Sequence, residues 1–426
     1  MSQEYILLKT ELSQLIEKTQ VVEKTHDYKE FRRLIKPFWK NLNENPDFGP
    51  NVDPKIEAEL LRLCAWYLCF SGQSTNLKYQ DHGKDLVSRS VEMFERVGET
   101  DRASRAKMLV ASTYFNAGQI NEALIVLDDA SSTYDNDGLH PMNLMLLTNK
   151  LGFLLWSSRY QEALEVLGDI EIPMELCEDP VLLARYKNNA GMLFGRIDKI
   201  ERAKGYYEEA IELSRKNGNL NFVGNILNNL AFGLIRAGRI DEAMTEVNEA
   251  IEIFEELKLD GWLAITYETK SQILMHQHKE EAALETINRS IELFEKGEHF
   301  AALADAYWFK THILLRLGRK EDGFMQFAKL TDFAAREIGE YAVKKFANAF
   351  SKIIYVKTGR GFADEVSSFK SELLMESLTD VDADMGEAAK NLKVSKKKLA
   401  NTINKQFPEI YLELGVMQGY ASNLAN

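Results

Sequence analysis

The fold is set by a stretch of twenty residues, 231–250, which reads AFGLIRAGRIDEAMTEVNEA. Its second glycine, Gly238, predicts the end of one helix, because glycine adopts the left-handed backbone conformation that closes helices. The acidic pair Asp241-Glu242 suits the positive end of a second helix. In that helix Ala243, Val247 and Ala250 recur at i, i+4 and i+7, which predicts one apolar face. The stretch therefore predicts two helices joined by a short turn.

The pattern returns every forty residues along most of the chain. A small residue marks the equivalent position in each copy, at Gly83, Ala123, Ala163, Ala203, Ala243, Ala283, Gly323 and Ala363. Twelve residues before each marker lies a second position, small in all but the third copy: Ser71, Ala111, Leu151, Gly191, Ala231, Ser271, Thr311 and Ser351. Small side chains at both positions predict that the two helices of a unit cross closely there. The spacing thus predicts about eight helix-pair units.

These repeated residues resemble the tetratricopeptide repeat, in a long version with an extended linker between units. The resemblance covers roughly residues 54–378. It implies an all-α fold, namely a right-handed superhelical solenoid of about eight 40-residue helix pairs. It also implies that the first helix of each unit lines a concave groove.

The N-terminal residues lack the marker positions. We expect helices over Glu4–Glu17 and Tyr28–Lys36, the second stopped by Pro37. An atypical terminal unit that covers the apolar face of the first repeat is expected of a solenoid. Residues 1–50 are therefore predicted to form a helical cap.

Composition and motifs argue against several other classes of protein. The net charge of −13 disfavours indiscriminate nucleic-acid binding by the body of the chain. Three cysteines give neither a disulfide framework nor a metal-ligand spacing, and His276 and His278 would point to different sides of a helix. No phosphate loop, zinc-protease motif or nucleophile elbow occurs. We expect a cytoplasmic protein with no catalytic residues, no metal site and no cofactor, and no membrane association.

A short basic segment interrupts the acidic chain near its C-terminus. Between Asp384 and Pro408 there are six lysines and only two acidic residues. Met385, Ala388, Ala389 and Leu392 would form one face of a short helix, and Leu399 with Ile403 a face of the next. The Ser395 hydroxyl is well placed to cap that second helix.

This segment resembles the Fis-type helix-turn-helix, through the residues Ala388, Ala389, Leu392, Val394, Ser395 and Leu399, with Lys393 in place of the usual turn glycine. The resemblance implies DNA contacts by Ser395, Lys396, Lys397, Lys398, Asn401 and Lys405. The alternative is a C-terminal capping hairpin whose lysines form a solvated face. A single motif neutralises few phosphates, so DNA binding would require a homodimer or a larger complex. We divide the chain accordingly into the cap (1–50), the repeats (51–378), the helix-turn-helix (379–408) and a tail (409–426).

The inner surface predicted for the repeats carries recurring polar residues. Fourteen residues before the marker, three successive units place Asn149, Asn189 and Asn229, and one helical turn earlier the spacing gives Arg105, Arg185 and Asn225. Asparagine offers a donor and an acceptor to an extended peptide backbone, and arginine favours a carboxylate. The arrangement is similar to peptide-receptor repeats, including those of bacterial regulators that couple a peptide signal to DNA binding. Alternatively, the asparagines bridge neighbouring helices within the scaffold.

Two functions therefore remain open from the sequence. The first is a cytoplasmic transcriptional regulator that binds a protein or peptide in its groove and DNA through its C-terminal motif. The second is a protein-interaction scaffold without DNA binding. The lysine cluster favours the first, and the overall acidity favours the second.

Overall fold

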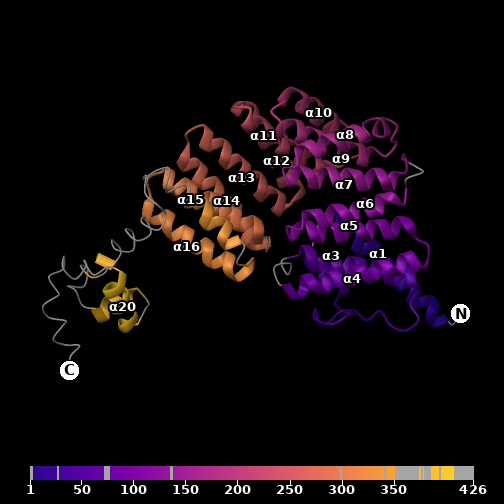
Figure 1. Ribbon diagram of the computed structural model, residues 1–426, viewed down its shortest axis with the longest axis horizontal. Coiled ribbons are helices and arrows are strands. Elements are labelled where there is room, and N and C mark those ends of the chain that lie inside the picture. The colour runs from indigo at the N-terminus through magenta and orange to yellow at the C-terminus, as the bar shows by residue number, and fades with distance from the viewer. Residues whose placement is uncertain are drawn as a thin grey trace. The chain divides into compact units, whose positions relative to one another are not determined.

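A computed structural model of the chain describes residues 3–25, 28–71, 77–134, 138–297, 300–339, 342–350, 374–375, 378, 385–392 and 395–406. Every regular element among these residues is a helix (Figure 1). The helices with defined bounds are α1 (Gln3–Thr25), α2 (Tyr28–Ile35), α3 (Pro54–Phe70), α4 (Leu77–Arg96), α5 (Thr100–Asn116), α6 (Ile120–Ser132), α7 (Pro141–Trp156), α8 (Tyr160–Glu175), α9 (Pro180–Arg196), α10 (Ile200–Lys216), α11 (Leu220–Arg236), α12 (Ile240–Leu257), α13 (Asp260–His276), α14 (Glu280–Gly297), α15 (Phe300–Arg316), α16 (Lys320–Glu337), α19 (Met385–Asn391) and α20 (Lys396–Gln406).

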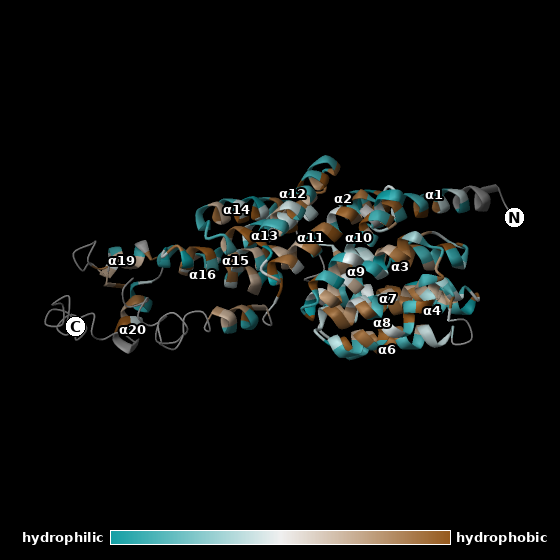
Figure 2. Cartoon of the chain, turned by 90° about the horizontal axis from the view of Figure 1, so that it is seen from above, coloured by the Kyte–Doolittle hydropathy of each residue, from teal (hydrophilic) through white to brown (hydrophobic). Residues whose placement is uncertain are grey.

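The helices from α3 to α16 form seven successive pairs, and each pair packs on the next (Figure 1). The predicted glycine turns are confirmed, since Gly118, Gly238 and Gly318 have φ values of 76°, 74° and 79°. The same left-handed position is occupied by Ser158 and Asp198, both with a φ of 60°. Hydrophobic and hydrophilic residues lie on different sides of the helices (Figure 2), as expected when each pair buries one face.

The predicted close crossing is confirmed in the central pairs. The marker alanines from Ala123 to Ala283 have no exposed surface. The Ser271 hydroxyl donates to the carbonyl oxygen of Ala283, twelve residues later, at 2.7 Å. At Gly191 an added Cβ would lie 2.8 Å from the Tyr207 ring, so a larger residue would push the helices apart. The positions four and seven residues after the markers are buried as well, which confirms the predicted apolar face.

The first pair departs from the expected spacing. Helix α3 ends at Phe70, thirteen residues before its marker Gly83, whereas α9 ends at Arg196, seven before Ala203. Ser71 therefore lies beyond the helix and is not the partner of Gly83 in the crossing. An added Cβ at Gly83 would instead lie 2.5 Å from the Cys69 Sγ. The longer connection after α3 accounts for the shift.

Helices α1 and α2 pack on α3. Their buried side chains, which include Leu12, Leu15, Val22 and Phe31, share one hydrophobic core with α3 and α4. Phe31 stacks on Tyr67 with ring centroids 5.2 Å apart. Helix α1 continues to Thr25 rather than ending at Glu17 as expected, because no proline or glycine interrupts it and Val22 extends its buried face.

The chain divides into two compact units, residues 1–339 and 340–426. In the second unit Leu374, Leu378, α19 and α20 share a small core. Residues 351–363, which would carry the two defining positions of the eighth repeat, lie outside the described residues, as do the turn residues 393–394 and the predicted tail. The predicted boundary at residue 378 thus stays a prediction.

Candidate functional site

The first helices of the central pairs expose a periodic set of side chains. On α9 these are Arg185, Asn189, Met192 and Arg196, spaced so that they share one helical face. Forty residues later α11 presents Asn225, Asn229, Phe232 and Arg236. The repeat therefore aligns chemically related positions along neighbouring helices.

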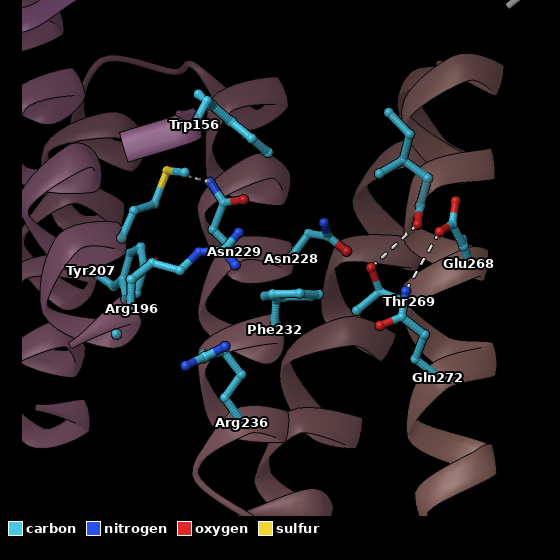
Figure 3. Close-up of a pocket in the computed structure, with 14 residues that line it drawn as sticks. Trp156, Arg196, Tyr207, Asn228, Asn229, Phe232, Arg236, Glu268, Thr269 and Gln272 are labelled. Carbon is cyan, nitrogen blue, oxygen red and sulfur yellow. Dashed lines mark hydrogen bonds between the residues drawn. The ribbon is translucent and has the colours of Figure 1, made fainter. Parts of the chain in front are cut away.

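These rows converge on a cavity of about 240 Å³ formed by α7, α9, α11 and α13. The side chains that give it its character are Trp156, Arg196, Asn228, Phe232, Arg236 and Glu268. Figure 3 shows the two arginines on one side of the Phe232 ring and Glu268 on the other. Trp156 is 63% exposed, which is unusual for so large an apolar side chain. The cavity thus combines aromatic surface with charge.

The two arginines of the cavity differ in their partners. Arg236 forms an ion pair with Asp198 in the preceding turn, at 3.4 Å. The residue equivalent to Asp198 for Arg196 is Ser158, which has no charge. The Arg196 guanidinium lies over the Phe232 ring, 5.0 Å from its centroid, and forms no ion pair within the described part of the chain. Arg196 therefore presents an uncompensated positive charge to the cavity.

Two other groups of the cavity lack full compensation. The Asn228 Oδ1 atom is buried and accepts no hydrogen bond from any described residue. Burial raises the pKa of Glu268 to about 7, and the nearby charge of Asp305 adds to the effect, while a hydrogen bond from Gln272 opposes it. A bound partner with N–H groups could satisfy both acceptors.

The three predicted asparagines bridge neighbouring helices, one of the two roles left open by the sequence. Asn189 Nδ2 donates to the Thr148 carbonyl oxygen of α7 at 3.0 Å. Asn229 Nδ2 donates to Asn188 Oδ1 of α9 at 3.1 Å. Asn149 Nδ2 donates to the Met145 carbonyl oxygen at 2.8 Å and contacts the Met108 sulfur at 3.4 Å. Only Asn229 also lines the cavity.

The other three predicted residues lie on the same faces outside the cavity. The Arg105 charge on α5 reaches Glu59 of α3, whose pKa it helps to lower. Arg185 is exposed to solvent, yet it lies among enough protein atoms for desolvation to lower its pKa, as expected on a concave face. Asn225 is half-buried on α11. A peptide contact by any of the six residues stays a prediction.

Apart from Asn229, the sequence analysis did not identify the residues that form the cavity. Trp156, Arg196 and Arg236 occupy one repeat position, seven residues before the marker, and Phe232 and Glu268 lie at two others. The forty-residue spacing would have identified this row if it had been followed to the ends of the first helices. The signal that sets Arg196 apart is the replacement of aspartate by Ser158 in the preceding turn.

The C-terminal unit holds the second predicted site. Met385, Ala388, Ala389, Leu399 and Ile403 are buried, which confirms the two apolar faces. The Ser395 Oγ accepts from the Lys398 amide at 3.2 Å, which confirms the predicted cap of α20. The three lysines Lys396, Lys397 and Lys398 are exposed, as is Asn401. Lys405 lies in α20, but its side chain is outside the described residues.

The described residues contain neither a metal-binding cluster nor a membrane-spanning helix. No three histidine, cysteine, aspartate or glutamate side chains gather in a way that could hold a metal ion. Each described helix is too short or too polar to span a lipid bilayer.

Comparison with known proteins gives matches to a family model and to solved structures. Residues 184–217, which cover most of α9 and all of α10, match the family model described as tetratricopeptide repeat. No curated protein matches the chain in sequence. The apo form of the quorum sensor NprR from B. thuringiensis is similar in fold, with a TM-score of 0.54 and 15% identity over 78% of this chain and 89% of that one.

A Rap protein complexed with Competence and Sporulation Factor is also similar, with a TM-score of 0.51 and 14% identity over 80% of this chain and 99% of that one. At such low identity these likenesses concern the fold alone. They agree with the seven stacked helix pairs and with the family match to the fourth of them. The chain therefore has the fold of a helical solenoid of stacked helix pairs, and one of its pairs matches the tetratricopeptide repeat.

Proposed function

We propose that the inner face of the central repeats binds an extended peptide segment that carries a carboxylate next to a large apolar side chain. The observation that carries this proposal is Arg196, a cation that has no acidic partner among the described residues, lies over the Phe232 ring and lines the cavity together with Trp156. The guanidinium would hold the carboxylate, and the two rings would cover the apolar side chain. Backbone N–H groups of the segment would donate to Asn228 Oδ1.

Several features support a binding role of this kind. Solenoid repeats present extended concave surfaces, and this one aligns polar and aromatic side chains in rows. Two proteins of similar fold are named for signals, the quorum sensor NprR and the Rap protein solved with Competence and Sporulation Factor. We propose a binding protein rather than an enzyme, whose partner is a peptide or a peptide-like segment of a protein.

A random-peptide display on the intact protein tests this proposal. The selected peptides should share an acidic residue beside a bulky apolar one. Binding of the best peptide, measured by calorimetry, should weaken about 10- to 100-fold in Arg196→Met, since a hydrogen bond to a charged group contributes about 1.5–3 kcal/mol. The matched control is Arg289→Met, which removes an exposed arginine of α14 that pairs with Glu285. Equal affinity of both variants for that peptide would rule out the proposed site.

We further propose that α19 and α20 act as a helix-turn-helix that contacts DNA. The specific observation is the row of exposed lysines, Lys396 to Lys398, at the beginning of a capped helix that packs on α19. Lysines in the first turn of a recognition helix would meet phosphates or guanine, and Asn401 could pair with adenine. The protein would then couple a bound peptide to gene regulation, in a homodimer or a larger complex.

Salt-dependent binding to duplex DNA separates this role from a capping hairpin. Each lost phosphate contact should reduce the slope of log affinity against log salt by about 0.9, so Lys396→Gln/Lys397→Gln/Lys398→Gln should reduce it by up to about 2.7. The control removes three exposed lysines of the repeats, Lys216, Lys258 and Lys279. If the two triple variants bind DNA alike, α20 makes no specific contact, and the protein is an interaction scaffold without DNA binding.

A further inference from the structure

A second cavity, of about 360 Å³, lies between α8, α9 and α10. It shares no lining residue with the first cavity. Its walls include four glutamates, two lysines and two tyrosines. Pro173 lies inside the last turns of α8, where its ring removes one backbone hydrogen bond of the helix at the border of this cavity.

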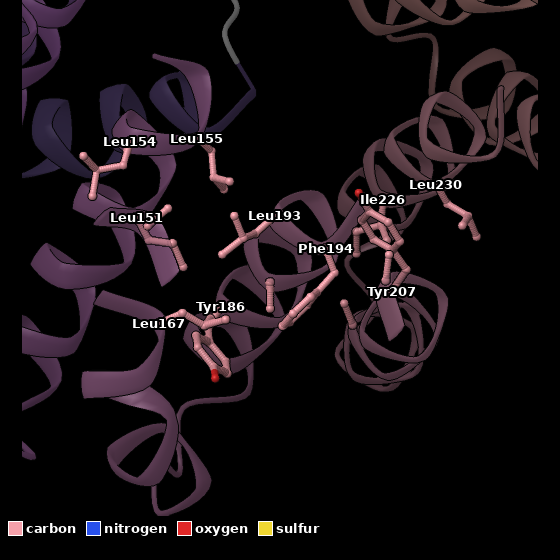
Figure 4. Close-up of a cluster of buried hydrophobic side chains, with 14 of the residues drawn as sticks. Leu151, Leu154, Leu155, Leu167, Tyr186, Leu193, Phe194, Tyr207, Ile226 and Leu230 are labelled. Carbon is pink, nitrogen blue, oxygen red and sulfur yellow. The ribbon is translucent and has the colours of Figure 1, made fainter. Parts of the chain in front are cut away.

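The Tyr186 hydroxyl has no partner at this cavity. The Tyr186 side chain is only 2% exposed, and its oxygen makes no hydrogen bond with any described residue. Figure 4 shows this oxygen pointing away from the neighbouring core side chains. At the equivalent positions, forty residues away, Leu146 and Ile226 are buried without a polar group. Packing alone therefore does not require the hydroxyl, and leaving it unsatisfied is unfavourable.

Two of the four glutamates at the cavity are neutralised by lysines. Lys187 Nζ lies 2.6 Å from Glu209, and Lys216 Nζ lies 2.6 Å from Glu212. Glu171 accepts a long hydrogen bond from the Tyr206 hydroxyl at 3.4 Å. Among the described residues, neither Glu171 nor Glu175 forms an ion pair. The cavity therefore keeps two uncompensated negative charges.

The repeat shows why Glu175 is left without a partner. Its equivalents at multiples of forty residues are Glu95, Glu255 and Glu295. Each of them contacts a residue on the first helix of the following pair. Lys107 lies 3.0 Å from Glu95, and the hydroxyls of Tyr267 and Tyr307 donate to Glu255 and Glu295 at 2.9 Å and 2.6 Å. The equivalent residue for Glu175 is Lys187, which pairs with Glu209 instead.

The two carboxylates and the free hydroxyl line the same cavity. Burial raises the pKa of Tyr186, and the charges of Tyr206, Glu171 and Glu175 raise it further, while Arg202 opposes them. Arg202 itself stacks over the Phe194 ring, 4.0 Å from its centroid, and does not line the cavity. Among the described residues, the cavity thus holds one hydroxyl without a hydrogen-bond partner and two carboxylates without an ion-pair partner.

We propose that this cavity binds the guanidinium group of an arginine side chain presented by a protein partner. A guanidinium has five N–H donors in a planar fork, enough for Glu171, Glu175 and the Tyr186 oxygen together. A lysine ammonium offers three donors from a single point, which suits this spread of acceptors less well. The site is independent of the proposed peptide groove, since the two cavities share no residue.

Fluorine NMR on the full chain labelled with 3-fluorotyrosine tests the site. Sixteen tyrosines give the signals, and the Tyr186 signal is the one lost in Tyr186→Phe. The probe is the capped tripeptide acetyl-Gly-Arg-Gly-amide, with its citrulline analogue and free arginine as comparisons. We expect a saturable shift of the Tyr186 signal with the arginine tripeptide and none with citrulline, which has a similar shape but no charge.

A pair of variants on one helix completes the experiment. Glu175→Gln should weaken tripeptide binding by about tenfold or more, as expected for the loss of one charge-assisted hydrogen bond. Glu165→Gln removes an exposed carboxylate of the same helix outside the cavity and should leave binding unchanged. The proposal is overturned if the Tyr186 signal does not respond, if citrulline acts like arginine, if only free arginine binds, or if both glutamate variants weaken binding equally.

Discussion

Helices α3 and α9 begin in the same way, but their equivalent polar side chains differ in solvent exposure. Each is capped by an aspartate, Asp53 or Asp179, whose side chain accepts from the first turn, and each has proline at its first position. Counted from that proline, Glu59 and Arg185 occupy the same place. On α3, Glu59 is only 6% exposed, whereas Arg185 on α9 is open to solvent.

Helix α1 accounts for the difference. Gln20 of α1 donates to Glu59 at 2.8 Å, and the Arg62 guanidinium donates to Glu23 of α1 at 2.6 Å and 2.8 Å. The chain thus supplies its own partner for the polar face of α3. On α9 and α11 the corresponding face keeps an unpaired arginine, Arg196, and an unsatisfied oxygen, Asn228 Oδ1. The comparison agrees with the proposal that the polar face of α3 is covered by α1 of the same chain, whereas the polar face of the central helices is left for a bound peptide.

The largest effect is expected from removing Arg62, whose hydrogen bonds to Glu23 join α3 to α1. Arg62→Met should lower the free energy of unfolding by about 3–5 kcal/mol, because Glu59 would remain buried without a cation. Urea unfolding measures the loss, and hydrogen exchange should show that α1 opens first. In Arg33→Met, which breaks only the exposed pair with Glu30, unfolding should be unchanged. If Arg62→Met behaved like this control, the ion cluster would not hold α1 to α3.

The contributions of Glu59 on α3 and Glu268 on α13 to the stability of the protein should depend on pH in opposite directions. Burial alone would raise the pKa of Glu59, but Arg62 and Gln20 lower it below its usual value. Its contribution to stability is therefore present above pH 4.5 and is lost as the pH falls through the lowered pKa. Glu268 has a pKa raised from 4.5 to about 7, so its contribution is complete below pH 4.5 and is lost as the pH rises to 7.

Glu268→Gln should remove the pH dependence of stability that arises from Glu268. Compared with the parent, the variant should be more stable by about 1–3 kcal/mol at pH 8 and show little difference at pH 4.5. Urea unfolding at a series of pH values measures both. The matched control is Glu165→Gln, at an exposed position, which should give no such trend. A parent protein with constant stability from pH 5 to 7 would contradict the raised pKa.

Much of this fold follows from the forty-residue spacing, and parts of the sites do not. The glycine turns at Gly118 and Gly238, the crossing of Ser271 with Ala283 and the Ser395 cap all follow from local chemistry. The pairing of Glu23 with Arg62 could not be predicted, because it depends on how α1, which lies outside the forty-residue spacing, packs on α3. Glu175 has no ion-pair partner among the described residues because Lys187 pairs with Glu209 instead. The forty-residue spacing does not predict which of these two carboxylates Lys187 contacts.

The smallest effect is expected from giving Arg196 an ion-pair partner within the chain, as Arg236 has in Asp198. Ser158→Asp places a carboxylate at the position from which Asp198 pairs with Arg236, and aspartate tolerates this left-handed turn conformation, as Asp198 itself shows. The new ion pair with Arg196 should stabilise the protein by less than about 1 kcal/mol, because it is partly exposed. It should nevertheless weaken binding of the selected acidic peptide about 2- to 5-fold, because the peptide must displace an internal carboxylate of similar strength. Calorimetry against Ser158→Asn, which has nearly the same shape without the charge, isolates this effect. Unchanged affinity in Ser158→Asp would mean that the peptide carboxylate does not bind Arg196, and that the unpaired charge of Arg196 has another binding partner.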